Sequence, residues 1–566
     1  MGTVTKIAKL YSVVRFYNQH GVSINLIIDL AVSQSSLTLI SFFKNRLIML
    51  KTFKLLFVLC LVAVMGSNAL GQTRYWVFFT DKKGVTLDSA SFCNQFWAIN
   101  GAEETDYPVS DQYISAVGSI AKSTGHTTRW FNAVAVEANS RQLKQIAKLP
   151  FVKDVRPTEG YFSVANHSAS IMSNDEIVLD LAFRQTERMG GRYFRDSSIT
   201  GKGVRIAIFD GGFPGVDKHE AFEHIRKENR IIATYDFTKN KTNVYHSNNH
   251  GTNVMSCIGG MYGDVPLGLA PDAEFLLAIT EVAKEPFSEE ENWLAAVEWA
   301  HRNGAKIINS SLGYTYHRYF TNQMDGRTSL VARAALLAAR KGMLVVNAAG
   351  NEGTDEWRAI GTPADADSIL TIGGVSPDTH LHIDFSSYGP TADGRRKPNV
   401  SAFGKAVVAK PTGGYNTAFG TSFASPLVAG FVACAWQLNP DMTNMELLEA
   451  IQQSADLYPY FDYAHGYGVP QAGYFINGPT NYAQSFDLYE YDTYYLVRVP
   501  NKTVDLISGY NTSVMFYSIV NPEGLITEYS AVRVYSPNAL RIYKESLSKG
   551  DKLYIHYLGY TGEYEF

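Results

Sequence analysis

Short apolar runs alternate with helical segments through the middle of the chain. Five runs are rich in branched side chains and lack the alternation of a half-exposed strand: Val204–Phe209, Glu274–Ile279, Lys306–Asn309, Leu344–Ala348 and Ile369–Gly373. Between them, Trp293–Asn303 and Leu330–Lys341 have helical spacing, and each ends directly before a glycine. Buried strands that alternate with helices are typical of a parallel sheet covered on both faces. The pattern predicts an α/β domain with a mostly parallel sheet.

The longest apolar run, Leu427–Trp436, follows a small-residue stretch that contains Ser422. A helix that is apolar all round is a buried helix, and we expect Pro426 in its first turns, where N–H groups have no intrahelical partner and a proline costs little. We therefore expect Ser422 at the start of a buried helix, where free N–H groups and the helix dipole favour negative charge. A serine in this place suits a nucleophile, but it also suits a simple helix cap.

Three further polar residues stand at the ends of apolar segments. Asp210 and Asn351 each follow a predicted strand, and His250 opens a second helix of small residues. In open α/β sheets, sites lie at the carboxyl ends of strands. A nucleophilic serine needs a base and a group that orients the base, so Ser422, His250 and Asp210 form a candidate triad.

These segments resemble the subtilase family of serine endopeptidases, over about residues 200–475. The chain order aspartate, histidine, serine is the subtilisin order. The matching motifs are Asp210-Gly, His250-Gly-Thr, Ser310-Ser-Leu-Gly313, Ala348-Ala-Gly-Asn351 and Gly420-Thr-Ser422-x-Ala-x-Pro426. A lipase or esterase would need the motif G-x-S-x-G and the order serine, aspartate, histidine, and both are missing. A non-catalytic binding protein on the same fold would not need all four polar residues.

The resemblance implies roles for individual residues. Asp210, His250 and Ser422 would form the catalytic triad, and Asn351 would donate to the oxyanion. The substrate-binding residues implied are Ser311, Leu312, Gly313, Ala349 and Gly350. The chemistry needs no cofactor; structural calcium is common in the family, but no acidic loop identifies a site, so metal residues stay unknown. Because the implied pocket walls and the floor near Gly361–Pro363 carry no charge, we expect a large apolar or aromatic residue at P1.

Upstream, the order strand, helix, strand, strand, helix, strand predicts a small ferredoxin-like unit. Its expected elements are a strand at Tyr75–Thr80, a helix at Ser110–Lys122, a strand or bent hairpin at Trp130–Ala138, a helix at Ser140–Leu149 capped by Ser140, and a strand at Phe151–Val155. Its place before the catalytic domain resembles that of a subtilase propeptide, an intramolecular chaperone and inhibitor; an ordinary accessory domain is the alternative. The stretch 158–200 is polar and is expected to be irregular.

The two ends of the chain differ from the middle. Basic residues in Met49–Lys54, the apolar run Leu55–Met65 and the small residues Ala69–Gly71 are typical of a secretory signal peptide, with a membrane anchor as the alternative. We expect synthesis to start at Met49 and the first 48 residues to be a misassigned extension. The last 85 residues hold 14 of the 34 tyrosines between short β-patterned runs, which predicts a small antiparallel β domain. A structural role is preferred for it over carbohydrate binding or sorting.

Composition narrows the function further. Acidic and basic residues nearly balance, with a net charge of −4, so nothing indicates nucleic acid as a partner. The four cysteines have no metal-ligand spacing; Cys257 and Cys434 are expected to be free, with a bridge between them left open. The expected domains are 1–48 extension, 49–71 signal peptide, 72–157 propeptide, 158–200 processing linker and mature N-terminal segment, 201–477 catalytic domain, and 478–566 β domain. Together they predict a secreted (extracellular, periplasmic or cell-surface) endopeptidase, made as a self-processing zymogen. Its partners would be protein substrates and its own propeptide, with no membrane after signal removal.

Overall fold

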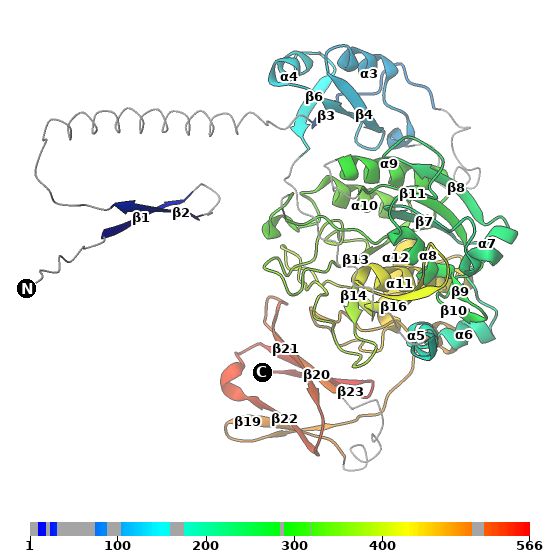
Figure 1. Cartoon of the computed structure of the whole chain (residues 1–566). Coiled ribbons are helices and arrows are strands. Elements are labelled where there is room, and N and C mark those ends of the chain that lie inside the picture. Colours follow the sequence, from blue (N-terminus) through cyan, green and yellow to red (C-terminus); the bar gives the residue numbers. More distant parts are fainter. Residues whose placement is uncertain are drawn as a thin grey trace, which may run out of the picture. The chain divides into compact units, whose positions relative to one another are not determined.

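The computed structural model describes residues 10–17, 23–30, 74–87, 103–158, 175–282, 288–316, 318–500 and 514–566 (Figure 1). The chain divides into two compact units, Met1–Gln72 and Thr73–Phe566. In the first unit, β1 (Leu10–Tyr17) and β2 (Ser23–Leu30) form an antiparallel pair, which the sequence did not suggest. The predicted signal peptide lies outside the described residues.

A seven-stranded parallel sheet forms the centre of the second unit. Its strands are β7 (Arg205–Asp210), β8 (Ile231–Asp236), β11 (Glu274–Ile279), β12 (Ile307–Ser310), β13 (Leu344–Ala348), β14 (Leu370–Val375) and β15 (Val400–Phe403). Their spatial order is β15-β14-β13-β12-β7-β11-β8, and every pairing is parallel. This confirms the predicted α/β class and adds β8 and β15 as the two edge strands.

Helices cover both faces of this sheet, which explains why its strands are apolar throughout. On one face lie α8 (His250–Gly259) and α11 (Thr421–Leu438), and on the other α9 (Ser288–Arg302) and α10 (Leu330–Arg340) (Figure 1). Successive side chains of β7 enter the two cores in turn. Ile206 and Ile208 pack in the core that contains α8 and α11, and Ala207 and Phe209 in the core that contains α9 and α10. The layered arrangement therefore follows from the side-chain alternation along each strand.

The helix α11 is buried along almost its whole length. Among the described helices, it alone has the length and apolar composition of a membrane span, but 89% of it is buried inside the protein, as in a core helix. Gly430 faces α8 so closely that a Cβ atom there would lie 2.9 Å from the carbonyl oxygen of Ile258. Cys257 in α8 and Cys434 in α11 are both buried and free, so the bridge left open by the sequence is not formed.

The remaining elements of the catalytic domain surround this core. They are α7 (Glu223–Lys227), β9 (Met261–Tyr262), β10 (Val265–Pro266), β16 (Lys405–Ala409), β17 (Tyr415–Phe419), α12 (Asn444–Ser454) and α13 (Ala472–Asn477), with short 3-10 turns at Glu220–Phe222 and Thr321–Gln323. The strands β16 and β17 form an antiparallel hairpin directly before α11. This hairpin delivers the chain to Gly420, whose φ of +143° favours glycine, and then to Ser422.

The described part of the segment 158–200, from residue 175 onward, is mostly helical, contrary to the prediction that the segment is irregular. It contains α5 (Asp175–Glu187) and α6 (Gly191–Asp196). Val178, Leu181 and Ala182 have helical spacing and are buried in the same core as α8 and α11. Gln185 joins the helix to the domain, because its Nε2 donates to the carbonyl of Leu267 at 2.6 Å and its Oε1 accepts from the N–H of Val407 at 2.8 Å. Exposed polar residues between the apolar ones hid this pattern in the sequence.

The small unit upstream has the predicted order of elements. They are β3 (Arg74–Phe79), α3 (Asp111–Gly118), β4 (Ser123–Thr128), β5 (Ala133–Glu137), α4 (Ser140–Ile146) and β6 (Val152–Pro157), with a 3-10 turn at Glu104–Asp106. The antiparallel sheet has the ferredoxin-like order β4-β5-β3-β6. Two details of the prediction were wrong: the hairpin begins earlier, at Ser123, and the cap of α4 is Asn139, whose Oδ1 accepts from the N–H groups of Arg141 and Gln142 at 3.0 Å each.

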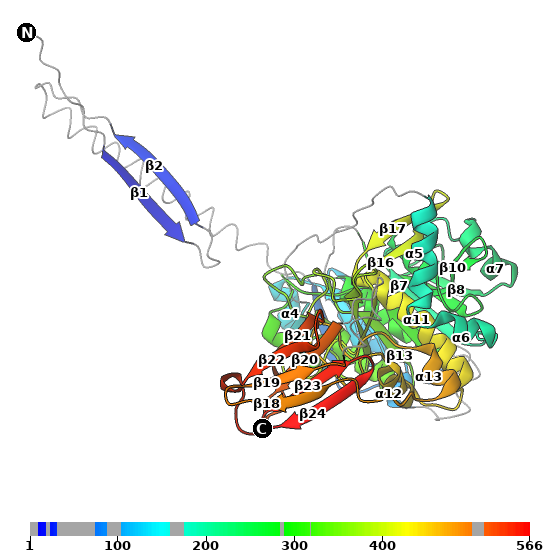
Figure 2. The same cartoon turned by 90° about the horizontal axis from the view of Figure 1, so that it is seen from below.

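The C-terminal residues form two antiparallel sheets, as predicted (Figure 2). The strands are β18 (Asp487–Glu490), β19 (Tyr494–Arg498), β20 (Val514–Val520), β21 (Ile526–Arg533), β22 (Asn538–Tyr543), β23 (Lys552–Tyr557) and β24 (Tyr560–Glu565), with a 3-10 turn at Lys544–Ser546. Their orders are β18-β19-β22 and β21-β20-β23-β24. Tyr460 of the catalytic domain donates its Oη to the carbonyl of Tyr517 at 3.1 Å and packs on Phe516 with ring centroids 5.8 Å apart, which joins the two domains.

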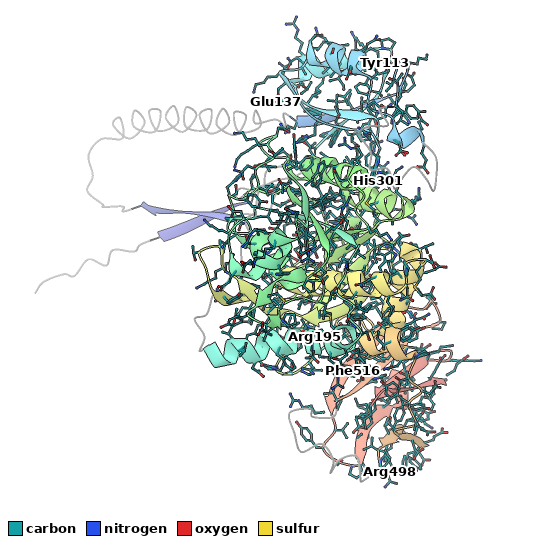
Figure 3. All side chains as sticks on the ribbon, turned by 90° about the vertical axis from the view of Figure 1, so that its right-hand side faces the viewer. Tyr113, Glu137, Arg195, His301, Arg498 and Phe516 are labelled. Carbon is teal, nitrogen blue, oxygen red and sulfur yellow. The ribbon has the colours of Figure 1, made fainter. Side chains whose placement is uncertain are left out.

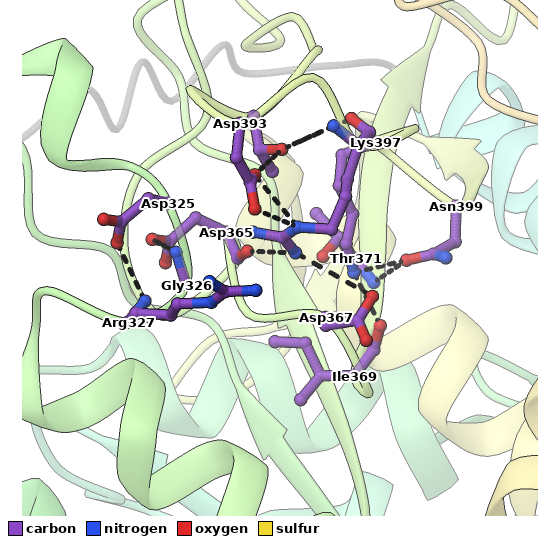
Figure 4. A network of polar contacts seen from close by, with 12 residues as sticks. Asp325, Gly326, Arg327, Asp365, Asp367, Ile369, Thr371, Asp393, Lys397 and Asn399 are labelled. Carbon is purple, nitrogen blue, oxygen red and sulfur yellow. Dashed lines mark hydrogen bonds and ion pairs between the residues drawn. The ribbon is translucent and has the colours of Figure 1, made fainter. Parts of the chain in front are cut away.

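A buried lysine lies in a network of polar contacts beside the sheet (Figure 4). The Nζ of Lys397 donates to the carbonyl of Ile369 at 2.7 Å and to Oδ1 of Asn399 at 2.9 Å. Burial lowers the pKa of Lys397 to about 7. Nearby, Asp365 accepts from the N–H of Gly326 at 2.7 Å, and its own carbonyl accepts from Arg395 at 2.8 Å. These contacts fix the far end of the loop that joins β13 to β14.

Candidate active site

One pocket lies at the carboxyl ends of the central strands and collects most of the residues singled out from the sequence. The lining includes Asp210, His250, Ser311, Leu312, Gly313, Gly350, Asn351 and Ser422. Asp210 ends β7, Ser311 follows β12, and Gly350 follows β13, so the parallel sheet brings together residues that are far apart in the chain. The helices α8 and α11 contribute His250 and Ser422 at their first turns.

Asp210 and His250 form a close pair. The Nδ1 atom of His250 lies 2.9 Å from Oδ2 and 3.0 Å from Oδ1 of Asp210, which is fully buried. Asp210 is held in turn by the N–H of Gly211, which donates to its Oδ1 at 2.7 Å. Burial opposes the charged imidazolium, but the charge and hydrogen bond of Asp210 outweigh it, so the pKa of His250 is raised. With Nδ1–H directed at Asp210, Nε2 is the nitrogen left to take a proton.

Ser422 is the second residue of α11, and its hydroxyl faces the pocket. Its Oγ donates to the carbonyl oxygen of Ser311 at 3.3 Å rather than to His250. A hydroxyl turns about one bond to a new acceptor, and catalytic hydrogen bonds are often unformed in the absence of substrate. The first N–H groups of a helix have no intrahelical acceptor, so the N–H of Ser422 is available to a negative charge in the pocket.

Pro426 lies in the second turn of α11, among the first turns as expected, but beyond the four N–H groups that lack an intrahelical acceptor. It is the sixth residue of the helix, so its missing N–H would otherwise have bonded to the carbonyl of Ser422, four residues earlier. The Oγ of Ser311 donates to that carbonyl at 2.9 Å instead. Ser311 Oγ accepts from Asn309 at 3.0 Å, and Asn309 accepts from Ser425 at 2.9 Å, so a short chain of bonds fixes β12 against α11. Sequence reasoning missed these contacts.

Asn351 lies in the pocket with a fixed amide orientation. Its Oδ1 accepts from the N–H of Thr421 at 2.8 Å and from the Oγ1 of Thr421 at 3.1 Å. Because its acceptor end is occupied by the residue next to Ser422, the NH₂ group is the end left for a ligand. Asn351 and Ser422 thus bring two donors, a side-chain amide and a backbone N–H, to the same pocket.

Four of the five predicted substrate-binding residues line the pocket, and Ala349 does not. Ala349 is fully buried, and its N–H donates to the carbonyl of Ile372 at 2.9 Å, so Ala348 takes its place in the lining. The predicted floor at Gly361–Pro363 is also absent from the lining, because Thr362 pairs with Tyr314 through two backbone hydrogen bonds of 2.8 and 3.1 Å. The apolar P1 preference stays a prediction.

Charged residues that the sequence analysis did not select also line the pocket. They are Glu281, Glu289, Arg318 and Glu352. Glu281 follows the carboxyl end of β11, and Glu289 lies in the first turn of the next helix, α9. Both positions lie at the carboxyl edge of the predicted sheet, so the sequence could have indicated them as candidate site residues. Within the described residues, no group of three or more histidine, cysteine, aspartate or glutamate side chains is arranged to hold a metal ion, so a structural calcium has no assigned residues.

The upstream unit packs on the helices α9 and α10 of the catalytic domain. Trp76, Trp130, Ala133 and Ala135 share one apolar core with residues of these helices. Glu298 of α9 accepts from the backbone N–H groups of Arg129 and Trp130, both at 3.1 Å, and from the hydroxyl of Thr128. Other contacts are charged: Arg74 forms a bidentate pair with Glu291 at 2.7 and 2.8 Å, and Lys341 bonds to Asp106 and Glu103 at 2.9 Å each.

A buried histidine lies at the same interface (Figure 3). His301 of α9 is 2% exposed, and its ring lies edge-on to Trp130 with centroids 5.8 Å apart. Burial, and then the positive charge of Lys341, lower the pKa of His301 to about 4. The histidine is therefore neutral while the upstream unit covers it.

Comparison with known proteins identifies the catalytic domain and the small domain upstream of it. The subtilase family model matches residues 201–468, and the model of the Bacteroidota S8 propeptide domain matches residues 74–171. Serine protease AprX of Bacillus subtilis is 29% identical over 290 residues, which are 46% of this chain and 62% of AprX, so the chain spans less than two thirds of that relative. A thermostable alkaline protease of Halalkalibacterium halodurans is 27% identical over 342 residues, 60% of this chain and 82% of that protein.

The solved structures agree with the fold. Fervidolysin of Fervidobacterium pennivorans, described as a keratinolytic enzyme related to subtilisin, aligns over 85% of this chain and 70% of its own with a TM-score of 0.53. At 17% identity this likeness shows the fold alone. The two matched family models and the curated relatives show that the chain belongs to the subtilase family of serine endopeptidases, with an S8 propeptide domain before the subtilase domain.

Proposed function

We propose that this chain is a secreted serine endopeptidase, made as a zymogen that removes its own propeptide. The observation that carries the proposal is the pair of His250 and Asp210, 2.9 Å apart, in one pocket with Ser422 and Asn351. A paired base, a hydroxyl at a helix start and an amide donor are the groups that acyl transfer needs.

The reaction follows from these positions. Ser422 Oγ turns from the carbonyl of Ser311 to Nε2 of His250, loses its proton to that nitrogen and attacks the scissile carbonyl carbon. Asp210 holds the imidazole in the required tautomer and stabilises the imidazolium. The Nδ2 of Asn351 and the N–H of Ser422 donate to the oxyanion as it forms. His250 then gives its proton to the leaving amine. In the second half of the reaction, water loses a proton to His250 and attacks the acyl-enzyme, and His250 returns that proton to Oγ of Ser422 as the ester bond breaks.

The propeptide would act as an inhibitor held on α9 and α10. The interface combines an apolar core around Trp130 with the buried carboxylate of Glu298, which accepts two backbone N–H groups. Such contacts need the propeptide to be folded, so the unit would dock as a body rather than as an extended peptide. Export through the segment 49–71 remains part of the proposal and is tested by sequencing the N-terminus of exported material.

The direct test is labelling with a fluorophosphonate, which reacts with an activated serine. The processed protein should be labelled and should hydrolyse denatured casein. Ser422→Ala should lose labelling and reduce turnover by several orders of magnitude. The control is Ser536→Ala, which removes an exposed hydroxyl of the C-terminal domain; this variant should still be labelled. A protein that folds, binds peptides and resists labelling would be a binding protein on this fold instead.

A further inference from the structure

Asn248 lies in the loop before α8 and lines the pocket together with Asp210, Gly211 and His250, yet the proposed hydrolysis gives it no role. Its side-chain Oδ1 accepts from the main-chain N–H of His250 at 3.0 Å. Because a backbone N–H can only donate, this contact sets which end of the amide faces α8. Asn248 therefore holds the first residue of the helix that carries the proposed base.

This hydrogen bond takes the place of an ordinary helix cap. The helix α8 begins at His250, and Asn249, in the N-cap position, makes no side-chain capping bond. The first N–H groups of a helix have no intrahelical acceptor, so the N–H of His250 needs a partner from outside the helix. An asparagine side chain readily bonds to the main chain two residues further on. Asn248, and not its neighbour, thus fixes the start of α8.

The main chain of Asn248 is bonded to the other half of the catalytic pair. Its N–H donates to the carbonyl of Gly211 at 3.2 Å, and the N–H of Gly211 donates in turn to Oδ1 of Asp210 at 2.7 Å. The two loops are in close contact, since a Cβ atom at Gly211 would lie 3.0 Å from the Cβ of Asn248. Two hydrogen bonds of one residue therefore connect the loop after Asp210 to the main chain of His250.

We propose that Asn248 is a positioning residue for the pair of His250 and Asp210, and that its side-chain oxygen sets the place of the His250 main chain relative to the Asp210 carboxylate. The proposal rests on the proposed endopeptidase function and adds a residue to its machinery. Without the acceptor, the first residue of α8 is no longer held, and the imidazole moves with its main chain. A displacement of about 1 Å in a reacting group can cost about 100-fold in rate.

The pKa of His250 reports on the contact with Asp210. Burial lowers this pKa, but the charge of Asp210 and its hydrogen bond raise it by more. The ring of Phe423, which packs on His250 from α11 with centroids 5.5 Å apart, carries no charge. A longer contact with Asp210 should therefore lower the pKa of His250, and a negative charge at position 248 should raise it. The other charged residues that line the pocket stay the same in this comparison: Glu281, Glu289, Arg318 and Glu352.

The experiment compares three variants of the full chain after self-processing, with active sites counted by complete fluorophosphonate labelling. Asn248→Ala removes the acceptor and should lower kcat by about 10- to 100-fold, with KM changed by less than about threefold. The acid limb of kcat/KM, which reports on the free enzyme, should move to lower pH. Asn248→Asp keeps an acceptor oxygen, so kcat should recover to within about fivefold of the unchanged protein, while the acid limb moves to higher pH.

The matched control is Asn249→Ala, which removes the neighbouring amide. Asn249 is exposed and makes no side-chain capping bond, so kcat, KM and the acid limb should all stay as in the unchanged protein. If Asn248→Ala does not fold, Asn248→Ser takes its place. Its shorter side chain offers a weaker acceptor, and the same loss of kcat and the same downward shift should appear at smaller size.

The outcomes separate positioning from other roles. A loss of kcat in Asn248→Ala, with opposite shifts of the acid limb in the alanine and aspartate variants, supports the inference. Unchanged kcat, a change confined to KM or a loss of kcat at an unchanged pKa overturns it, as does an equal loss of kcat in both variants. If the unchanged protein itself neither labels nor cleaves any peptide, the proposed endopeptidase function fails, and the role of Asn248 fails with it.

Discussion

Ser311 Oγ donates to the carbonyl oxygen of Ser422 at 2.9 Å and so replaces the backbone N–H that Pro426 lacks. This bond joins the end of β12 to the first turn of α11. It satisfies a buried carbonyl of the serine proposed to be the nucleophile, and it holds that residue against the wall that Ser311, Leu312 and Gly313 form. The Oγ of Ser311 would therefore position the proposed nucleophile, while Ser311 itself lines the pocket.

Ser311→Ala should reduce kcat more than it raises KM. Removing the hydroxyl leaves the carbonyl of Ser422 without a partner, at a cost of about 1–3 kcal/mol in stability. A shift of the nucleophile should lower kcat by roughly 10- to 100-fold. Steady-state kinetics and thermal unfolding measure the two effects. Ser311→Thr keeps the hydroxyl and should recover most of the activity; equal losses in both variants would contradict the positioning role.

Asn351→Ala should lower kcat with little change in KM. The amide would be needed mainly when the carbonyl oxygen becomes an oxyanion, so its loss should cost about 100- to 1,000-fold in kcat, the range known for such a donor in subtilisin, a relative of this chain. Labelling by a fluorophosphonate should slow in parallel. A variant that loses affinity but keeps kcat would show that Asn351 binds the ground state instead.

Maturation should cut the chain between residues 159 and 174. The helix α5 begins at Asp175 and places Leu181 and Ala182 in the catalytic core, so a cut within α5 would remove buried contacts of the domain. Upstream, β6 pairs with β3 as far as Pro157. Mass spectrometry of the processed protein identifies the new N-terminus. A mature protein that begins after Glu187 would contradict this boundary, and Ser422→Ala should stay uncut in the absence of other proteases.

Falling pH should release the cut propeptide through His301. Its pKa is about 4 in the covered state and near 6.5 when exposed, so between pH 6.5 and 4 the separated form binds the proton more strongly and is favoured. Burial raises the pKa of Glu298, which acts in the opposite direction. The unchanged protein is therefore compared with the His301→Asn variant. The rate at which the propeptide is released, measured as recovery of peptidase activity, should change less with pH in the variant over this range. Identical pH profiles would exclude His301 as the cause.

The buried ammonium group of Lys397 should lower the free energy of unfolding near neutral pH, and it should lower it by less at alkaline pH, where the group loses its proton more easily. Its pKa is about 7 in the folded protein and 10.5 in the unfolded chain, so between these values the unfolded state binds more protons, and stability rises with pH. In a Ser422→Ala background, the stability of the chain with Lys397 should rise relative to Lys397→Met by up to about 1.4 kcal/mol per pH unit from pH 7 to 10. Denaturant unfolding measures it; a constant difference would contradict the depressed pKa.

The sequence predicted the strands well, and the polar residues that it selected lie together, because each of these predictions depends on local pattern. β11 and β13 have the predicted bounds, and Asp210, His250, Asn351 and Ser422 line one pocket. What it missed depends on contacts between distant segments. The apolar face of α5 has meaning only against the core it joins, and Ala349 could not be separated from Ala348 without the direction of its side chain.

The charged residues of the pocket were also missed by the sequence analysis, because they meet only through contacts between distant segments. Glu281 and Glu289 are eight positions apart in a stretch of ordinary polarity, and nothing in their spacing indicates that they line the same pocket as His250. Their meeting with Arg318, beyond the next strand, is a product of the parallel sheet. The expectation of an uncharged pocket was drawn from the motif residues alone.

The sheet of the propeptide domain has two covered faces. Val77, Val134 and Val136 pack beneath its own helices, while Trp76, Ala133 and Ala135 pack against the catalytic domain. Once cut and detached, the domain presents an uncovered tryptophan-bearing face to water, and little burial is left to offset the entropy of ordering so short a chain. Detachment would thus lead to unfolding, and an unfolded inhibitor is a substrate for the enzyme it has left. Activation by this route would be irreversible, because the detached inhibitor is degraded before it can bind again.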